Sequence, residues 1–242
     1  MGTTEGLYRT KTYWNLRAEG YSKNVNAELD GDVGKDWASF LTELAPLDTH
    51  RRVLDIGCGP GFFSILLSLR GYEVTAVDYT ENMLMQAREN AEKRNARVKF
   101  MQMDAQELSF GNDSFDLIVT RNVTWNLEDP LKAYSEWFRV LRKGGKLVNA
   151  DGNHFYYVAD PDYRLFYEKS ERDHKYMDGI DTGIINALAE KNPLARELRP
   201  AWDIRTAFDL GAQYASARIT DEYIMPDSGK RLIENFIMTA EK

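Results

Sequence analysis

The alternation of short apolar runs with amphipathic segments between residues 52 and 150 constrains the fold of this chain more than any other feature. Apolar runs are typical of buried strands, and apolar residues three or four positions apart are typical of helices packed on a sheet. Strands that alternate with helices indicate a parallel sheet with crossover helices. The predicted strands are 52–56, 73–78, 98–104, 115–120 and 146–150, and the predicted helices are 61–69, 81–95 and 130–141.

The last forty residues follow a different pattern. After a predicted helix over 202–210, two β-prone segments, 216–225 and 233–239, flank the turn-rich stretch 226–229. A parallel crossover needs about a dozen residues or more, so this short connection favours an antiparallel pair. We therefore expect a doubly wound α/β sheet that is mainly parallel and closes with an antiparallel C-terminal strand pair.

No linker divides the chain, so residues 1–242 are predicted to form a single domain. Residues 1–50 are expected to form a helical, aromatic N-terminal lid, 51–151 to carry the regular cofactor-binding core, and 202–242 to hold the closing helix and strand pair. Residues 152–201 are rich in aromatic side chains and lack strand alternation. We expect this α-helical, aromatic insertion to cap a closed pocket for a small molecule; the alternative is a purely structural insertion.

Composition excludes several classes of function. The formal net charge is −7 and no run of five or more basic residues occurs, which argues against nucleic acid as a partner. Cys58 is the single cysteine, so no intrachain disulfide can form. The opening residues lack the apolar stretch of a secretory leader, so none is expected, and no apolar run is near the roughly 20 residues that a bilayer requires. We expect a soluble cytoplasmic protein without a membrane partner; its oligomeric state stays open.

Polar residues and glycines gather where four predicted strands end. The turn 55–61 is rich in glycine and leads directly into a helix, so its backbone can approach a ligand and donate hydrogen bonds. Asp78 ends the second strand and can accept both hydroxyls of a ribose, while Asp104 with Ala105 suits the exocyclic amino group of a base. Residues 120–122 lie under the reactive part of any ligand that spans the sheet. Each feature alone could be a helix cap or a turn, but their order favours a site at the carboxyl edge of the sheet.

The glycine spacing separates two adenosine-containing cofactors. Gly57, Gly59 and Gly61 depart from the dinucleotide pattern, which would place its third glycine at Phe62. Asp55 stands two residues before the first glycine, where a carboxylate would repel a pyrophosphate and attract the ammonium group of a methionine. Electrostatics therefore favour S-adenosylmethionine over a nicotinamide dinucleotide.

These segments resemble the motifs of class I S-adenosylmethionine-dependent methyltransferases of the small-molecule type. The resemblance implies a Rossmann-like, mainly parallel seven-stranded sheet and methyl transfer to an acceptor. It is carried by the first motif, Val53–Gly61, by the three that follow, Ala76–Asp78, Met103–Ala105 and Phe115–Val119, and by the turn Arg142–Leu147.

The same resemblance implies the cofactor residues. The methionine end is assigned to Asp55, Gly57, Cys58, Gly59 and Gly61, the ribose to Asp78, and the adenine to Asp104 and Ala105. Tyr13, Trp14 and Tyr21 resemble the N-terminal lid of the family. The expected cofactor-binding set is completed by Tyr79, Met83, Arg121 and Asn122.

Methyl transfer from a sulfonium is an in-line displacement that depends mainly on alignment, and a general base is needed only when the acceptor carries a proton. The candidate catalytic residues are Asp151 and His154, which follow the fifth strand, together with Asn122; His174 is a weaker candidate base. No metal is expected. Residues 122–125 lack the Pro-Pro-aromatic pattern of amino-group methylases acting on DNA. The acceptor atom stays open among O, N, S and C.

Two other functions remain possible at this point. A non-catalytic sensor would bind S-adenosylmethionine and signal to a partner protein. An NAD-dependent oxidoreductase would bind the nicotinamide cofactor instead. Binding of each cofactor, followed by a methyl-transfer assay, distinguishes the three.

Overall fold

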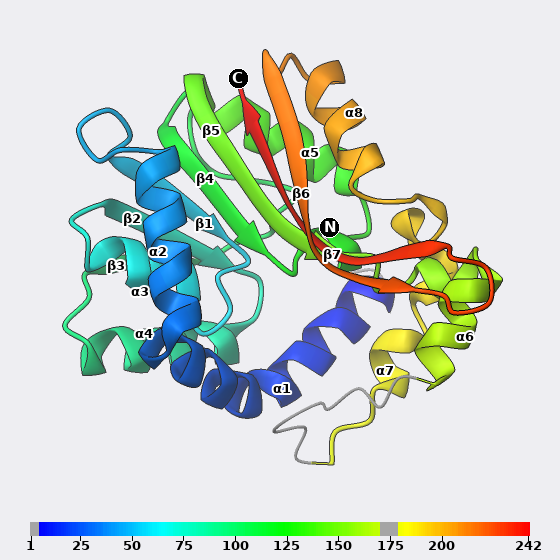
Figure 1. Cartoon of the computed structure of the whole chain (residues 1–242). Coiled ribbons are helices and arrows are strands. Elements are labelled where there is room, and N and C mark those ends of the chain that lie inside the picture. The colour runs from blue at the N-terminus through cyan, green and yellow to red at the C-terminus, as the bar shows by residue number, and fades with distance from the viewer. Residues whose placement is uncertain (1–4, 170–178) are drawn as a thin grey trace.

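The computed structural model describes residues 5–169 and 179–242 and is built on a seven-stranded sheet (Figure 1). The strand order is β3-β2-β1-β4-β5-β7-β6. The first five strands are parallel, and β7 runs antiparallel between β5 and β6. The predicted fold class is confirmed. The strands are β1 (Arg52–Ile56), β2 (Glu73–Asp78), β3 (Val98–Gln102), β4 (Phe115–Arg121), β5 (Leu141–Gly152), β6 (Tyr214–Ile224) and β7 (Arg231–Glu241).

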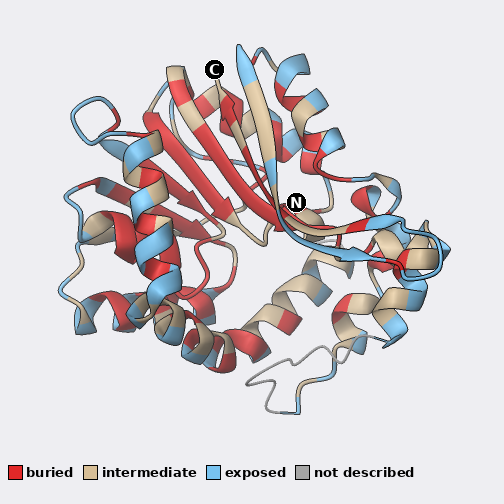
Figure 2. Ribbon diagram, viewed as in Figure 1, coloured by how far each residue is buried: buried red, intermediate tan, exposed pale blue. Residues whose placement is uncertain are grey.

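Helices cover both faces of the sheet. On one face, α2 (Asp32–Leu44) and α3 (Phe62–Ser68) pack on side chains such as Val53 and Val119. On the other, α5 (Pro130–Val140) and α8 (Ala201–Asp209) pack with neighbouring side chains such as Leu54 and Ile118. Figure 2 shows the central strands buried along most of their length. Burial on both faces explains why these strands are apolar runs in the sequence.

Local signals place several helix ends where the sequence predicts them. The side chain of Asp129 accepts a hydrogen bond from the N–H of Lys132, and Pro130 begins α5. Gly71 has φ +89° and follows α3, where the N–H groups of residues 71 and 72 bond back to Ser68 and Leu67 in the pattern of a Schellman motif. Thr80 precedes α4 (Glu81–Lys93) as expected, but its side chain makes no capping hydrogen bond.

Several element bounds differ from the predictions, and β5 and β3 show why. β5 begins at Leu141 rather than at residue 146, because Leu141 pairs with Phe115 before a shift in register. β3 ends at Gln102, and Asp104 instead forms an isolated bridge with Glu107. Each of these bounds is set by pairing with a neighbouring strand that is distant in sequence, which is β4 for the start of β5 and β2 for the end of β3.

The chain before β1 and the cap pack together beyond the sheet. A long helix, α1 (Glu5–Asp30), crosses below the carboxyl ends of the central strands (Figure 1). Its Tyr13 packs with Phe155 and Ile185 of the cap. His174 lies outside the described residues. The described part of the cap contains short helices and no strand, namely η2 (Tyr156–Val158), α6 (Pro161–Lys169), α7 (Gly183–Asn186), η3 (Ala189–Lys191) and η4 (Pro193–Arg196).

Across residues 5–169 and 179–242, no helix combines the length and the apolar character that crossing a bilayer demands.

Candidate cofactor site

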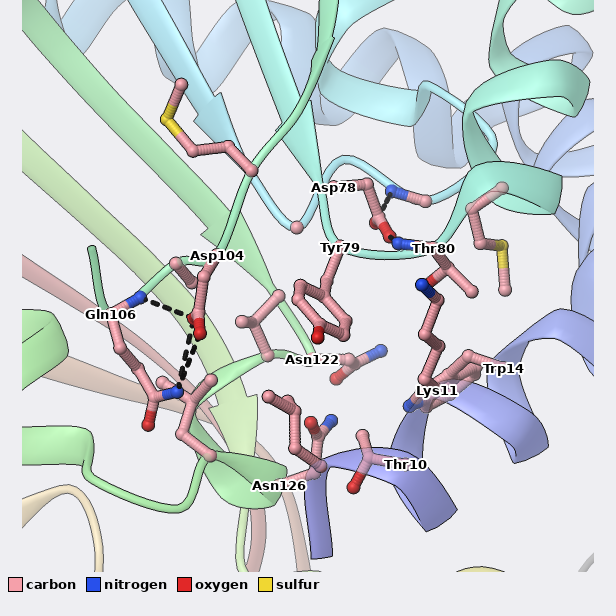
Figure 3. Close-up of a pocket in the computed structure, with 18 of the residues that line it drawn as sticks. Thr10, Lys11, Trp14, Asp78, Tyr79, Thr80, Asp104, Gln106, Asn122 and Asn126 are labelled. Atoms are coloured by element: carbon pink, nitrogen blue, oxygen red, sulfur yellow. Dashed lines mark hydrogen bonds between the residues drawn. The ribbon is translucent and has the colours of Figure 1, made fainter. Parts of the chain in front are cut away.

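A cavity lies between α1 and the carboxyl ends of β1, β2 and β4 (Figure 3). The space between its walls is about 810 Å³, including space open to solvent. Most of the predicted cofactor-binding residues line it, namely Tyr21, Gly57, Gly59, Asp78, Tyr79, Met83, Asp104, Ala105, Arg121 and Asn122. The strand ends therefore converge on one site, as the motif order predicts.

The glycine turn forms a cradle of bare backbone. Gly57 has φ +63° and Gly59 has φ +50°, both in the left-handed region that favours glycine. A Cβ at Gly57 would collide with Val123, and one at Gly59 would lie 3.6 Å from the ring of Tyr21. A side chain at Gly59 would fill the space between the turn and α1, so the turn fits a cofactor that contacts backbone.

Asp78 places a fixed carboxylate in the cavity wall. Its Oδ2 accepts a hydrogen bond from the N–H of Gly59 at 2.9 Å, and its Oδ1 accepts one from the N–H of Thr80 at 2.8 Å. Burial raises the pKa of this carboxyl, and these hydrogen bonds oppose the rise. Because a carboxylate oxygen can accept more than one hydrogen bond, Asp78 retains capacity for two ligand hydroxyls.

Gln106, which the sequence reasoning missed, orients Asp104. The Oδ1 of Asp104 accepts hydrogen bonds from the backbone N–H of Gln106 at 2.8 Å and from its side-chain amide at 3.1 Å (Figure 3). The amide oxygen of Gln106 in turn accepts from the N–H of Asp129 at 2.6 Å. An Asp followed two residues later by a backbone donor is an Asx turn, which was the available signal.

Arg121 joins the end of β4 to α1. Its guanidinium donates two hydrogen bonds to the carboxylate of Glu28, at 2.7 and 2.8 Å, and lies 4.6 Å above the ring of Phe62. Burial lowers the pKa of Arg121, but pairing with Glu28 outweighs it and leaves the pKa raised. The cation at this edge of the cavity is thus held by a bidentate pair.

Asn122 follows Arg121 in a left-handed conformation with φ +57°. Its N–H donates to the carbonyl of Ala150 at 2.8 Å, and its own carbonyl accepts from the indole N–H of Trp125 at 2.9 Å. This turn directs the Asn122 side chain toward the cavity (Figure 3).

One face of α1 forms the opposite wall. Leu7, Thr10, Lys11, Trp14 and Tyr21 line the cavity, and their spacing is that of one helix face. Figure 3 shows Lys11 and Trp14 reaching in from the helix, with the Lys11 ammonium 5.0 Å from the centre of the Tyr79 ring. Sequence reasoning named Trp14 and Tyr21 but missed the others, and it missed further lining residues, among them Thr80, Met103, Val123, Asn126, Leu127 and Glu128.

Three predicted cofactor residues do not line the cavity: Asp55, Cys58 and Gly61. The Oδ2 of Asp55 accepts hydrogen bonds from the N–H of Ser64 at 2.9 Å and from its hydroxyl at 2.5 Å, so it caps the first turn of α3. Burial raises the pKa of Asp55 to about 7. Cys58 packs against Ala76, and burial raises the pKa of its thiol well above the usual range, which disfavours a reactive thiolate.

The candidate bases lie outside this cavity as well. Asp151 is fully buried; its Oδ2 lies 3.1 Å from the Arg199 guanidinium and accepts from the N–H of Trp125 at 3.2 Å. The Nε2 of His154 is 3.9 Å from Asp151, and its ring meets Trp125 edge-on at 4.9 Å. Asp151 thus pairs with Arg199, and catalytic roles for Asp151 and His154 stay predictions. The described residues contain no group of three or more His, Cys, Asp or Glu side chains placed to hold a metal ion.

Comparisons with known proteins agree with this geometry. Residues 54–149 match the family model described as a methyltransferase domain. A demethylmenaquinone methyltransferase of Thermus thermophilus is 36% identical over 126 residues, which cover 51% of this chain and 57% of that protein. An uncharacterised methyltransferase of Bacillus subtilis is 29% identical, over 78% of this chain and 76% of its own. The chain thus spans little more than half the length of the Thermus protein.

Solved structures resemble the whole sheet. An S-adenosylmethionine-dependent methyltransferase from Methanosarcina mazei superposes with a TM-score of 0.55 at 22% identity, covering 80% of this chain and 93% of that one. At this identity the likeness shows the fold. Residues 54–149 are therefore a methyltransferase domain, and the fold around them is the one seen in an S-adenosylmethionine-dependent methyltransferase.

Proposed function

We propose that this protein transfers the methyl group of S-adenosylmethionine to a small-molecule acceptor. The observation that carries the proposal is the cavity in which a bare glycine turn and the carboxylates of Asp78 and Asp104 face one helix, α1. That donor set matches an adenosine with an amino acid tail and lacks the phosphate-binding spacing of a dinucleotide site.

Each lining group has a proposed role. Asp78 accepts the ribose hydroxyls, and Asp104 with Ala105 binds the adenine edge. The backbone of the glycine turn and the Asn122 side chain hold the methionine end. Asp55, which lies behind the turn, acts on the ammonium group through its charge rather than by direct contact.

The chain contributes mainly alignment and exclusion of water. S-adenosylmethionine supplies, when bound, a methyl carbon on a sulfonium sulfur; the acceptor lone pair forms the new bond while the old carbon–sulfur bonding pair stays on sulfur. Trp14 and Tyr21 shield the site from solvent, and Asn122 fixes the direction from which the acceptor approaches the methyl carbon. When the acceptor carries a proton, His154 is the proposed base that removes it.

Calorimetry with S-adenosylmethionine, its demethylated product and NAD tests the cofactor, and mass spectrometry of an acceptor panel tests turnover. The panel includes a demethylated menaquinone, because the Thermus relative is named for that acceptor. We expect binding of the first two ligands, no binding of NAD, and a mass gain of one methyl group in an acceptor. Binding without turnover on any acceptor would favour the sensor, and methylation of protein or nucleic acid alone would contradict the acceptor class.

A further inference from the structure

The segment that follows β3 is fixed at the wall of the cofactor cavity. Asp104 forms an isolated bridge with Glu107, and its backbone carbonyl accepts a hydrogen bond from the N–H of Glu107 at 3.1 Å. The carbonyl of Ala105 accepts one from the buried indole N–H of Trp137 at 2.9 Å. Asp104, Ala105 and Gln106 all line the cavity. A ligand therefore meets these residues on a backbone that is already held in place.

The side-chain amide of Gln106 is satisfied in only one orientation. Its oxygen lies 2.6 Å from the backbone N–H of Asp129, a group that can only donate. The amide nitrogen must then be the atom that lies 3.1 Å from Oδ1 of Asp104 (Figure 3). A flipped amide would set nitrogen against N–H and oxygen against a carboxylate, and Gln106 is buried, so unpaired polar groups there are costly. Gln106 therefore presents a donor to Asp104.

This donor decides which oxygen of Asp104 a ligand can use. Oδ1 accepts hydrogen bonds from the backbone N–H and from the side-chain amide of Gln106, at 2.8 and 3.1 Å. Oδ2 lies 3.4 Å from the same amide, beyond the usual range of a hydrogen bond, and so keeps its lone pairs for a ligand. An ionised carboxyl group is an acceptor only. Asp104 in this position therefore favours a ligand group that donates a hydrogen bond.

We propose that Gln106 determines the selectivity of the cofactor site for a base that carries an exocyclic amino group. It is a positioning residue, because it acts on the base through the carboxylate of Asp104. The alternative is a structural role in which Gln106 only ties the end of β3 to the start of α5 through Asp129. The inference rests on the proposed function, which places adenine beside Asp104.

Two ligands that differ only in the amino group test this selectivity. One is S-adenosylhomocysteine, and the other is its analogue with purine in place of adenine, in which a hydrogen atom replaces the 6-amino group. Calorimetric titration of the full chain with each ligand gives the ratio of the two dissociation constants. We expect the wild type to bind S-adenosylhomocysteine about 10- to 100-fold more tightly, the range for one hydrogen bond to a charged group.

Two substitutions separate positioning from a structural role. Gln106→Glu keeps an oxygen for the N–H of Asp129 but replaces the donor to Asp104 with a second carboxylate. Gln106→Met has a similar length and removes both hydrogen bonds. If Gln106 positions Asp104, both variants should reduce the ratio to about threefold or less. A wild-type ratio in Gln106→Glu would show that the role is structural and would overturn the inference.

The same two changes at Gln102 are the matched controls. Gln102 ends β3, is exposed, and donates its amide to the carbonyl of Tyr79 at 3.0 Å rather than to Asp104. Gln102→Glu and Gln102→Met should therefore keep the wild-type ratio. If the ratio falls as far in these controls as in the Gln106 variants, Gln106 is not its source.

The wild-type titrations distinguish this inference from the proposed function. A chain that binds neither ligand would refute the cofactor assignment and the inference together. Equal and measurable affinity for both ligands would refute the inference alone, because the cofactor would then bind without selection for the amino group.

Discussion

At the scale of single residues, cofactor affinity is expected to depend most on Asp78, which lines the cavity and whose two oxygens accept hydrogen bonds from the N–H groups of Gly59 and Thr80. Asp78→Ala should weaken binding of S-adenosylhomocysteine by about 1.5–3 kcal/mol, since charged hydrogen bonds to two hydroxyls are lost. Calorimetry measures the loss, and circular dichroism checks the fold. Glu81→Ala, in the exposed first turn of α4, is the control. Equal affinity in both variants would contradict the ribose assignment.

Asp55 makes stability depend on pH. Burial raises its pKa from an ordinary 3.8 to about 7, so the folded state favours the protonated form. The stability that this gives is complete below about pH 4 and is lost as the pH rises through 7, by at most about 4 kcal/mol. Asp55→Asn keeps an acceptor for Ser64 but cannot ionise. From pH 5 to pH 8 the free energy of unfolding should therefore fall less in this variant than in the wild type. Urea denaturation at both pH values measures the two free energies of unfolding. If they change by the same amount between pH 5 and pH 8, Asp55 is not the source of the pH dependence.

The residues at strand ends could be predicted from sequence, whereas the direction of some side chains could not. Asp78 ends a parallel strand, Asp104 and Asn122 follow the ends of two others, and such ends meet at one edge of a sheet. Asp151 also ends a strand, yet it turns toward Arg199, a cap residue that no local pattern associates with it. Asp55 turns beneath the glycine loop because the first turn of α3 offers it two donors.

At the scale of elements, α1 was the hardest part to predict. Its helical character was expected from the aromatic N-terminal segment, but the face toward the cavity mixes Leu7, Thr10, Lys11 and Trp14. A helix that faces a ligand cavity and a cap does not need a continuous apolar stripe. By contrast, α5 packs on the sheet and shows that stripe clearly.

The pair between Glu28 and Arg121 is expected to hold the C-terminal half of α1 against β4. Glu28→Gln removes the charge from a half-buried bidentate pair and should cost about 1 kcal/mol. We expect faster amide hydrogen exchange in the last turns of α1 and weaker cofactor binding. Glu19→Gln is the control on the same helix, because Glu19 pairs with Lys23 in solvent. Equal exchange in both variants would show that the pair does not hold the helix.

At the scale of the whole molecule, a buried polar network joins the cap to the sheet and to both helices behind it. Arg199 of the cap lies 3.1 Å from Asp151 of β5 and 2.6 Å from Asp203 of α8. Tyr134 of α5 donates to Asp203 at 2.6 Å, and Asn149 of β5 donates to Tyr134 at 2.8 Å. The sequence could not reveal this network, because its members come from three elements and the cap, and each alone resembles an ordinary polar residue.

Arg199→Met should therefore destabilise the whole chain rather than the cap alone. The variant leaves two carboxylates buried without their cation, which typically costs about 3–5 kcal/mol. For a chain of this size that corresponds to a fall in Tm of roughly 6–20 °C in a calorimetric scan. Arg205→Met is the control, since Arg205 forms an exposed pair with Glu197 and should change stability by less than about 1 kcal/mol. If the two variants melt together, the network does not hold the cap on the sheet.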